Sequence, residues 1–282
     1  MKRLSQKLSS IFFRSAKYKL KSENINGHDV HFVDINNPKS LLLLHEAYKY
    51  IYEPAFPIDN ERESIEFWLN EIRNEHNNLD IIIAIAIDQT NPKKIKPKAI
   101  SVGNFFKKQS VGLMAYNAIA EEYRNQNISL AMVNARKEAF LELAKKQNTD
   151  LNGIFIECND PEKVTLEEDS FDPALRIRIF NKFGAKTVPI NYVQPPADKG
   201  LERCDLLKLL AYPHPKTMEY PKPSTIQGFI DGIYNSCAKF SGCHPSVNPD
   251  YIKIKEEISK LPNEPIHPNW EVTTIENTAK PK

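Results

Sequence analysis

One stretch, residues 111–147, constrains the fold of this chain more than any other. It opens with an apolar run of strand length at 111–119, and a polar segment at 121–127 then interrupts it. From Ile128 onward the apolar residues recur at helical spacing and so lie near one face. The pattern predicts a strand, a polar turn and a long helix. This turn suits a phosphate group, because the first amides of a helix have no internal partner and the helix dipole favours negative charge there.

The turn itself, residues 120–131, reads AEEYRNQNISLA. It resembles the loop that binds the pyrophosphate of acyl-CoA in the GCN5-related N-acetyltransferase (GNAT) superfamily, where the usual pattern is Q/R-x-x-G-x-G/A. Arg124 takes the first place, and Asn127 and Ser129 stand where the family has glycines. Asparagine tolerates the left-handed backbone region better than most residues with a side chain, so Asn127 is a suitable replacement. The hydroxymethyl group of Ser129 would crowd the ligand.

Later segments resemble the same superfamily in the same order. The segment at 153–161, GIFIECNDP, is similar to the family's fifth strand and its exit, and 176–185, RIRIFNKFGA, to the next helix. The segments at 192–195 and 205–210 resemble the closing strands of a little-characterised bacterial subgroup. The resemblance covers residues 79–212. It implies an α/β (α+β) fold with a mixed, mostly antiparallel central sheet, flanking helices and a C-terminal helical extension.

Local patterns predict the other elements of the chain. Strands are expected at 31–35, 79–87 and 98–106 before the strand at 111–119, and the last three should form an antiparallel meander. Prolines break the chain at 53–57. One helix is expected at 40–51, after a cap at Asn36 or Asn37, and a second begins after a cap at Asp59 and carries Trp68 on its apolar side. A third is expected at 224–237, with a capping box formed by Ser224 and Gln227. A fourth begins after Asn248 and Pro249.

Changes in composition divide the chain into four parts. These are a basic segment at 1–24, a GNAT-like domain at 25–213, a helical extension at 214–262 packed on that domain, and a loose polar tail at 263–282. The basic segment has no acidic residue before Glu23 and carries apolar residues at helical spacing. Three interpretations remain open for it: an amphipathic helix in weak contact with a membrane surface, a targeting sequence, or an ordinary terminal helix with solvated lysines.

The overall composition, 41% apolar and 26% charged, is that of a soluble globular protein. A net charge of +2 gives no case for nucleic acid as a partner. No apolar run approaches the roughly 20 residues of a transmembrane segment. Four cysteines in 282 residues do not suggest a disulfide framework, so a reducing cytoplasm is expected. Cys237, Cys243 and His244 lack zinc-like spacing, so we expect no metal. Abundant lysine, asparagine and isoleucine suggest a bacterial source.

The resemblance implies the chemistry and its reagents. In the superfamily an amine attacks the thioester carbonyl of acyl-CoA directly. The implied co-substrate is therefore acetyl-CoA, and the implied partner is an amine, either a small molecule or a protein lysine or N-terminus. The implied cofactor-binding residues are Asn117, Ala118 and Ile119 in the strand, Arg124, Asn125, Gln126, Asn127, Ile128 and Ser129 in the loop, and then Asn159 and Phe180.

The chain offers candidates for proton transfer. Glu157 ends the fifth strand and is either the general base or a carboxylate that caps or pairs at the strand end. Phe180 stands where the family usually has a tyrosine that protonates the leaving thiolate, so another donor is needed. Tyr116 is the candidate general acid, and Tyr123 and Tyr192 are further candidates, each only by its place along the chain.

Other side chains have a structural as well as a functional interpretation. Phe56 and Trp68 belong either to the acceptor cleft or to the core. Asn159 either binds the cofactor arm or belongs to the Asn-Asp-Pro turn. Arg176 and Arg178 cannot share a helix face, so a solvated position is expected for them.

The expected activity is acyl-CoA-dependent N-acetyl transfer. Because the loop glycines and the tyrosine are replaced, the alternative is a catalytically inactive relative that serves as a protein-interaction module or an acyl-CoA sensor. Binding without turnover would indicate the sensor, and no binding would indicate the interaction module.

Overall fold

The structure is a computed structural model that describes residues 20–57, 62–74, 78–91, 94–167, 169, 171–197 and 200–266. Within these ranges the chain forms one sheet of eight strands in the order β1-β2-β3-β4-β5-β6-β8-β7. Neighbouring strands are antiparallel except β5 and β6, which are parallel. This mixed, mostly antiparallel sheet confirms the predicted fold class. The strands are β1 Glu23–Ile25, β2 His28–Phe32, β3 Leu79–Asp88, β4 Lys96–Phe106, β5 Val111–Ile119, β6 Gly153–Asn159, β7 Lys186–Thr187 and β8 Leu207–Tyr212.

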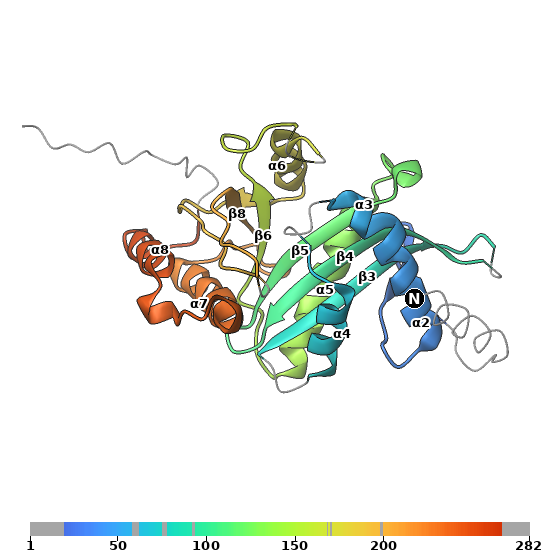
Figure 1. Ribbon diagram of the computed structural model, residues 1–282, viewed down its shortest axis with the longest axis horizontal. Helices are drawn as coiled ribbons and strands as arrows, with labels where there is room; N and C mark the ends of the chain where they lie inside the picture. Colours follow the sequence, from blue (N-terminus) through green and yellow to red (C-terminus); the bar gives the residue numbers. More distant parts are fainter. Residues whose placement is uncertain are drawn as a thin grey trace, which may run out of the picture.

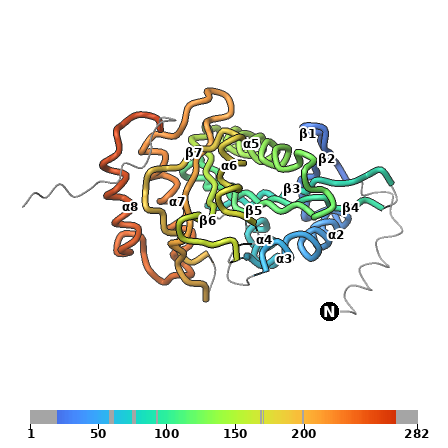
Figure 2. Tube along the Cα trace, turned by 90° about the horizontal axis from the view of Figure 1, so that it is seen from above, coloured from blue at the N-terminus to red at the C-terminus, as the bar shows by residue number. Residues whose placement is uncertain are grey.

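Helices cover both faces of the sheet (Figure 1). Figure 2 shows α5 on one side of the strands and α2, α3 and α4 on the other. Buried residues of α5 and α6 join those of the strands in two apolar clusters, and buried residues of α2, α4 and α7 join the sheet in a third. The helices are α2 Pro38–Ala47, the π-helix η1 Tyr48–Tyr52, α3 Glu53–Ala55, α4 Ile65–Arg73, η3 Glu121–Tyr123, α5 Ile128–Lys146, α6 Pro173–Lys182, α7 Pro223–Ser241, η4 Pro245–Val247 and α8 Pro249–Ser259.

The central meander of β3, β4 and β5 is confirmed nearly as predicted. Strand β3 is apolar along almost its whole length because both of its faces are covered. Alternate residues face opposite sides, so Ile83 and Ile85 enter the cluster beneath α4 and α7, while Ala84 and Ala86 face α5. The small alanine side chains allow α5 to approach the sheet closely.

The first strand and helix differ from the prediction at their ends. Asn26 and Gly27, both at positive φ, turn the chain into a hairpin between β1 and β2, so the strand lies at His28–Phe32 rather than at 31–35. Asn37 caps α2, as predicted, by accepting from the backbone N–H groups of Lys39 and Ser40. The predicted break at 53–57 comes only at Phe56, because η1 and α3 continue the helix.

Two predicted helix caps are wrong. Ser64, not Asp59, caps α4, where its hydroxyl accepts from the backbone N–H of Phe67 at 3.1 Å. Asp59 itself lies outside the described residues. The capping box of Ser224 and Gln227 does not form, because Gln227 donates to Asp231 and no side chain caps α7 among the described residues. A proline in the first turn of α7 compensates in part, because proline has no N–H to satisfy there.

Helix α7 packs directly on the sheet. Phe229 stacks on Phe155 of β6 with ring centroids 4.5 Å apart and meets Phe106 of β4 at 6.0 Å. Asn248 caps α8, as predicted, by accepting from the N–H groups of Asp250 and Tyr251. The four-part division of the chain stays a prediction. Residues 1–19 of the basic segment and 267–282 of the tail lie outside the described residues.

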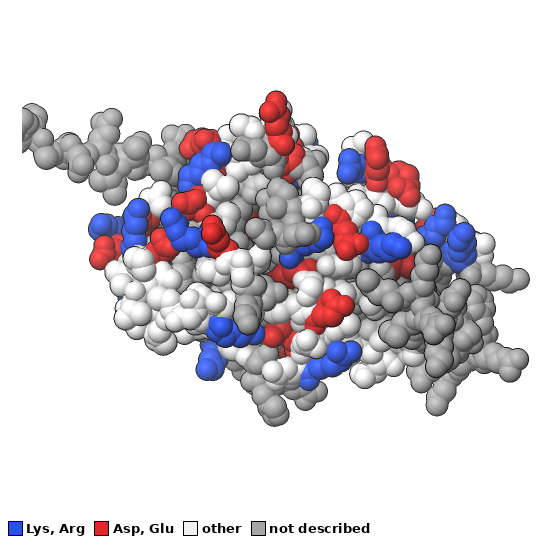
Figure 3. Space-filling model, viewed as in Figure 1, with Lys and Arg blue, Asp and Glu red and all other residues white. Residues whose placement is uncertain are grey.

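The described helices include none that combines the length and the apolar character needed to cross a membrane. On the face shown in Figure 3, lysine and arginine side chains are interspersed with aspartate and glutamate over the part of the chain that the structure describes.

Candidate active site

The two parallel strands at the centre of the sheet separate partway along their length. β5 and β6 pair from Val111 with Gly153 to Met114 with Ile156 and no further. β5 nevertheless continues to Ile119, with β4 as its partner. β6 likewise continues along β8. The last five residues of β5 therefore have a strand on one side only.

A β-bulge lies at the point of separation. In the ladder between β4 and β5, Val102 faces Tyr116 and Gly103 faces Met114, so Ala115 is the extra residue. A bulge bends its strand and increases the local twist. The bulge therefore accounts for the departure of β5 from β6.

The ladder also determines which amides of β5 face the side of β6. The N–H of Ala120 donates to the carbonyl of Lys98 at 2.9 Å. In an antiparallel ladder the backbone groups of alternate residues point toward the partner and away from it. The register continues from Ala120 without a shift, so Asn117 and Ile119 direct their N–H groups away from β4, toward the side that β6 has left. The amide of Ala118 faces β4. Of the three strand residues predicted to bind the cofactor through their backbone, two present their amides at the gap.

The turn after β5 adopts left-handed backbone angles at two asparagines, and one of them, Asn127, stands where the resembling pattern has glycine. Asn127 has φ of 59° and Asn125 has φ of 61°. Ser129 lies within the first turn of α5. Among the described residues, no side chain caps α5, so its first amides are not satisfied by a capping side chain. Nε2 of His28 forms a 2.9 Å hydrogen bond with the carbonyl of Gln126 in this turn. The side chain of Arg124 is exposed.

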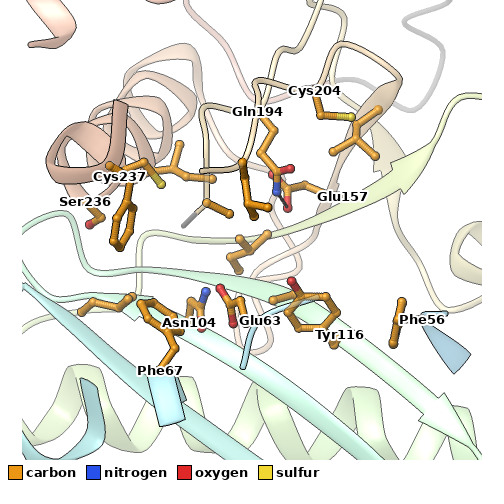
Figure 4. A pocket seen from close by; sticks show the side chains of 18 of the residues that line it. Phe56, Glu63, Phe67, Asn104, Tyr116, Glu157, Gln194, Cys204, Ser236 and Cys237 are labelled. Atoms are coloured by element: carbon orange, nitrogen blue, oxygen red, sulfur yellow. Dashed lines mark hydrogen bonds between the residues drawn. The ribbon is translucent and has the colours of Figure 1, made fainter. Parts of the chain in front are cut away.

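A cavity of about 860 Å³ lies beside the separated strands (Figure 4). Tyr116 of β5, Glu157 of β6 and Cys237 of α7 line it, together with Glu63 just before α4. Neighbouring side chains of a strand point to opposite faces of the sheet, yet Cys158 lines the cavity as well as Glu157. The cavity therefore reaches both faces of the sheet through the gap between β5 and β6.

Glu157 is held in this cavity by two hydrogen bonds. The hydroxyl of Tyr192 donates to its Oε1, and Nε2 of Gln194 donates to its Oε2 at 3.1 Å. Burial raises the pKa of Glu157 to about 7, although both hydrogen bonds act in the opposite direction by stabilising the carboxylate. A carboxyl group with such a pKa can exchange a proton near neutral pH.

A second carboxylate, Glu63, lies among aromatic rings in the same cavity. Its side chain accepts from Nε1 of Trp68 at 2.6 Å, and its backbone N–H donates to the hydroxyl of Tyr52 at 3.0 Å. The ring of Tyr52 makes edge contacts with Trp68 and Tyr116 at 4.8 and 5.1 Å. Of the two aromatic residues with open interpretations, Trp68 belongs to the core and Phe56 lines the cavity.

The predicted proton donors occupy different environments. Tyr116 lines the cavity, and burial together with the charge of Glu63 raises its pKa well above the usual value. Tyr192 is buried in the core and donates to Glu157. Tyr123 lies on η3, where its hydroxyl faces Asp88. Phe180 packs with Ile156 and Cys158 in the cluster beneath α5 and α6, and it does not line the cavity.

A polar cluster lines the cavity near α6. Nδ2 of Asn159 donates to Asp169 at 2.8 Å, and both terminal nitrogens of Arg176 contact the same carboxylate at 2.7 Å. Burial raises the pKa of Asp169, but the hydrogen bonds and charge of Arg176 outweigh it and lower the pKa overall. The expectation of a solvated Arg176 is therefore wrong. The reason is tertiary: the loop before α6 brings Asp169 to the helix.

No family model and no curated protein matches this sequence. Solved structures do match. A Bacteroides thetaiotaomicron protein described as an acetyltransferase of the GNAT family is 16% identical, with 64% of this chain and 85% of that chain covered and a TM-score of 0.41. The ribosomal-protein-S18-alanine N-acetyltransferase from Escherichia coli is 12% identical, with 66% and 94% covered and a TM-score of 0.40. The PaiA N-acetyltransferase from Thermoplasma acidophilum, in complex with coenzyme A, is 13% identical, with 65% and 98% covered and a TM-score of 0.37.

The mixed, mostly antiparallel sheet with helices on both faces (Figure 1) is the fold that the sequence resemblance predicted. At these identities and TM-scores, any function rests on the topology and side chains of the chain itself. Among the described residues, no group of three or more His, Cys, Asp or Glu side chains could hold a metal ion.

The sequence did not reveal the surroundings of Glu157 in this cavity. Tyr192 and Gln194 were expected in a closing strand, but Gln194 forms only an isolated bridge to Cys204. The spacing of Tyr192 and Gln194 did indicate that their side chains share one face, because residues i and i+2 of an extended segment point the same way. Nothing near Glu63 in the sequence marked it as a cavity residue.

Proposed function

We propose that this protein is an acyl-CoA-dependent N-acetyltransferase that transfers the acetyl group directly to an amine. The observation that carries the proposal is the position of Glu157. Its carboxyl group faces the cavity beside the last pair of β5 and β6, where the amides of Asn117 and Ile119 face the gap. A base and hydrogen-bond donors therefore lie on the two strands that border one opening.

The co-substrate would lie across this opening with its pyrophosphate at the first turn of α5. The left-handed angle of Asn127 supports this placement, because it gives the turn the backbone shape for which the family uses glycine. The pyrophosphate would be held by the loop residues Arg124, Asn125, Gln126, Asn127, Ile128 and Ser129. The amides of Asn117 and Ile119 would bind the pantetheine arm and the thioester carbonyl.

Glu157 would act as the general base. An amine arrives protonated, and a carboxylate with pKa near 7 can accept its proton directly or through one water molecule. The neutral amine then forms the C–N bond, the C–S bond breaks, and the extra proton on the nitrogen of the product passes to water. The leaving thiolate needs a proton. Tyr116 lines the cavity, but its raised pKa makes it a weak acid. Protonated Glu157 is the stronger acid and can return the proton it took.

The cavity favours a cationic acceptor. Its acidic side chains outnumber its basic ones, and Arg176 and Lys239 are each paired with one of the acids. Such a lining attracts an ammonium group through electrostatic complementarity. The acidic residues are Glu63, Glu71, Glu157, Asp169 and Glu202, and the basic residues are Lys108, Arg176 and Lys239.

Calorimetric titration with acetyl-CoA tests the proposal. We expect saturable binding by the wild type and about tenfold weaker binding by Arg124→Ala, because one charge-assisted contact to phosphate is lost. Lys145→Ala, which removes an exposed cation from the far end of α5, is the matched control and should bind as the wild type does. No binding at millimolar ligand would overturn the proposal.

A screen of amines, with free coenzyme A thiol as the readout, then tests turnover. Release of thiol that depends on an amine supports the transferase. Binding without turnover of any amine would replace the transferase with an acyl-CoA sensor.

A further inference from the structure

A guanidinium group is buried directly behind the bulge of β5. Arg136 extends from α5 toward the sheet and is 0% exposed. Within the described chain, all its hydrogen bonds go to backbone carbonyls. Its Nε donates to Met132 at 3.2 Å, and its Nη1 donates to Tyr116 at 3.2 Å and to Val102 at 3.4 Å. Its Nη2 has no partner among the described residues.

Stability does not account for a cation at this position. A buried charge without a carboxylate is unfavourable, and an apolar side chain of similar volume often replaces a buried ion without loss of stability. Burial lowers the pKa of Arg136 to about 10, so the group stays charged at neutral pH. The charge therefore calls for an explanation other than packing.

The two β-strand carbonyls that Arg136 contacts belong to the pair beside the bulge. Val102 and Tyr116 face each other immediately after Ala115. Gly103, the next residue of β4, leaves room for the side chains of α5. A Cβ there would lie 2.8 Å from Phe140 Cζ and 3.6 Å from Arg136 Cδ. The local sequence thus allows the guanidinium to reach the bulge.

The carbonyl of Tyr116 and the N–H of Asn117 belong to one peptide group. Because the peptide is planar and trans, the two point in opposite directions. The carbonyl lies on the side of β4 and Arg136, and the N–H points toward the gap beside β6. A positive charge at the carbonyl oxygen polarises the peptide and strengthens its N–H as a donor.

We propose that Arg136 is a positioning residue for acetyl transfer. By binding the carbonyl of Tyr116, it fixes and polarises the peptide between Tyr116 and Asn117, so that the N–H of Asn117 stabilises negative charge on the thioester oxygen. This charge forms when the amine attacks the carbonyl carbon, and it returns to the carbonyl bond as the C–S bond breaks. The inference rests on the proposed transferase function.

Two variants test this role, with a third as control. Arg136→Met removes the charge at similar length, and Arg136→Lys keeps it. Val133→Ala truncates another buried residue of α5, which belongs to the apolar cluster of Phe105 and Phe140. We would measure the affinity for acetyl-CoA, kcat and KM with the best amine, and the infrared stretch of the carbonyl in bound acetyl-CoA carrying carbon-13 at that position.

For Arg136→Met we expect nearly unchanged affinity and KM, but kcat lower by about 10- to 100-fold, below the loss seen when an oxyanion donor is deleted outright. The carbonyl stretch should move to higher frequency, because the donor to the oxygen is weaker. Arg136→Lys should recover most of kcat and of the frequency. Val133→Ala should lower the melting temperature and leave both readouts unchanged.

Each opposite result overturns the inference. If the wild type turns over acetyl-CoA and Arg136→Met matches it in kcat and carbonyl frequency, Arg136 has no positioning role and the proposed function still stands. If Val133→Ala lowers kcat equally, the effect is general loosening of α5. If the wild type binds no acetyl-CoA, the proposed function falls and the role of Arg136 falls with it.

Discussion

The two halves of β5 belong to one strand but have different surroundings. From Val111 to Met114 the strand is paired on both sides and buried. From Ala115 to Ile119 it is paired on one side only, and Tyr116 lines the cavity. The paired half is packed tightly: Gly112 lies against the ring of Phe140 with no room for a side chain. The second half has polar neighbours, namely Arg136 behind it and Glu157 on the strand it has left.

This contrast indicates that the site arises where the ladder between β5 and β6 ends. A fully paired strand uses its backbone groups internally, so it has none to offer a ligand. Once the bulge turns β5 away, the amides of Asn117 and Ile119 are released while β4 still holds the strand in place. Substitutions in the first half should therefore affect stability, and substitutions around the second half should affect chemistry.

The largest effect is expected for Glu157→Gln, which belongs to the second half. Removing the base should lower kcat/KM by about 10²- to 10⁴-fold. In the wild type, burial raises the pKa of Glu157 to about 7, so the rate should increase as the pH rises through that value and the carboxyl ionises. A pH–rate profile measures this step, and the variant should lack it. A variant with the full rate and the same profile would assign the base to another group.

The same pKa makes a prediction for stability. The folded pKa of Glu157 lies above its ordinary value of 4.5, so the folded state holds the proton more tightly than the unfolded state does. This contribution is fully present below 4.5 and is lost as the pH rises through about 7. Urea unfolding above neutral pH should therefore find Glu157→Gln at least as stable as the wild type. A large loss of stability there would indicate that the carboxylate is mainly structural.

In the first half of β5, Gly112→Ala should destabilise the fold. Its new Cβ would meet the ring of Phe140 at 2.5 Å, and relieving such overpacking costs about 1–3 kcal/mol. Gly228→Ala is the matched control, because its Cβ would meet nothing closer than 3.8 Å. Because Gly228 lies in the interior of α7, where alanine is the better helix former, Gly228→Ala should raise the free energy of unfolding by roughly 0.5–1 kcal/mol. Denaturant unfolding measures both, and equal effects would contradict the tight packing of the paired half.

Tyr192→Phe should produce a smaller, purely electrostatic change. The Tyr192 hydroxyl stabilises the ionised form of Glu157, so its removal raises the pKa of Glu157 further. The rising limb of the pH–rate profile should move to higher pH by about one pH unit. Tyr234→Phe is the control, since that hydroxyl donates to the carbonyl of Val193 at 2.8 Å. A shift in the control, or none in Tyr192→Phe, would contradict the assigned hydrogen bond.

The smallest effect concerns the turn that follows the second half. Asn127 has φ of 59°, so Asn127→Gly should be neutral or slightly stabilising, whereas Asn127→Ala should lose about 1 kcal/mol. Thermal unfolding compares the two. If alanine is tolerated as well as glycine, the left-handed conformation is not required there.

The sequence predicted the meander and the strand–turn–helix unit closely, because apolar period and element length are local properties. β5 has the predicted bounds, and α5 begins at Ile128 as expected. The left-handed angle at Asn127 agrees with the glycine position that the family resemblance implied there. Caps were less predictable. Several polar residues near the start of a helix can serve as its cap. Which one does so depends on where the folded chain begins the helix, and for α4 that residue is Ser64.

For the site, the resemblance seen in the sequence predicted that Glu157, the β5 strand and the turn form one unit. The tertiary structure alone decided their surroundings. The bulge at Ala115, the burial that raises the pKa of Glu157, its hydrogen bonds from Tyr192 and Gln194, and the reach of Arg136 from α5 join residues that are distant in the chain. The physical reason is that periodicity and propensity describe a residue and its near neighbours. Burial, strand separation and the environment of a charge depend on which segments the fold brings together.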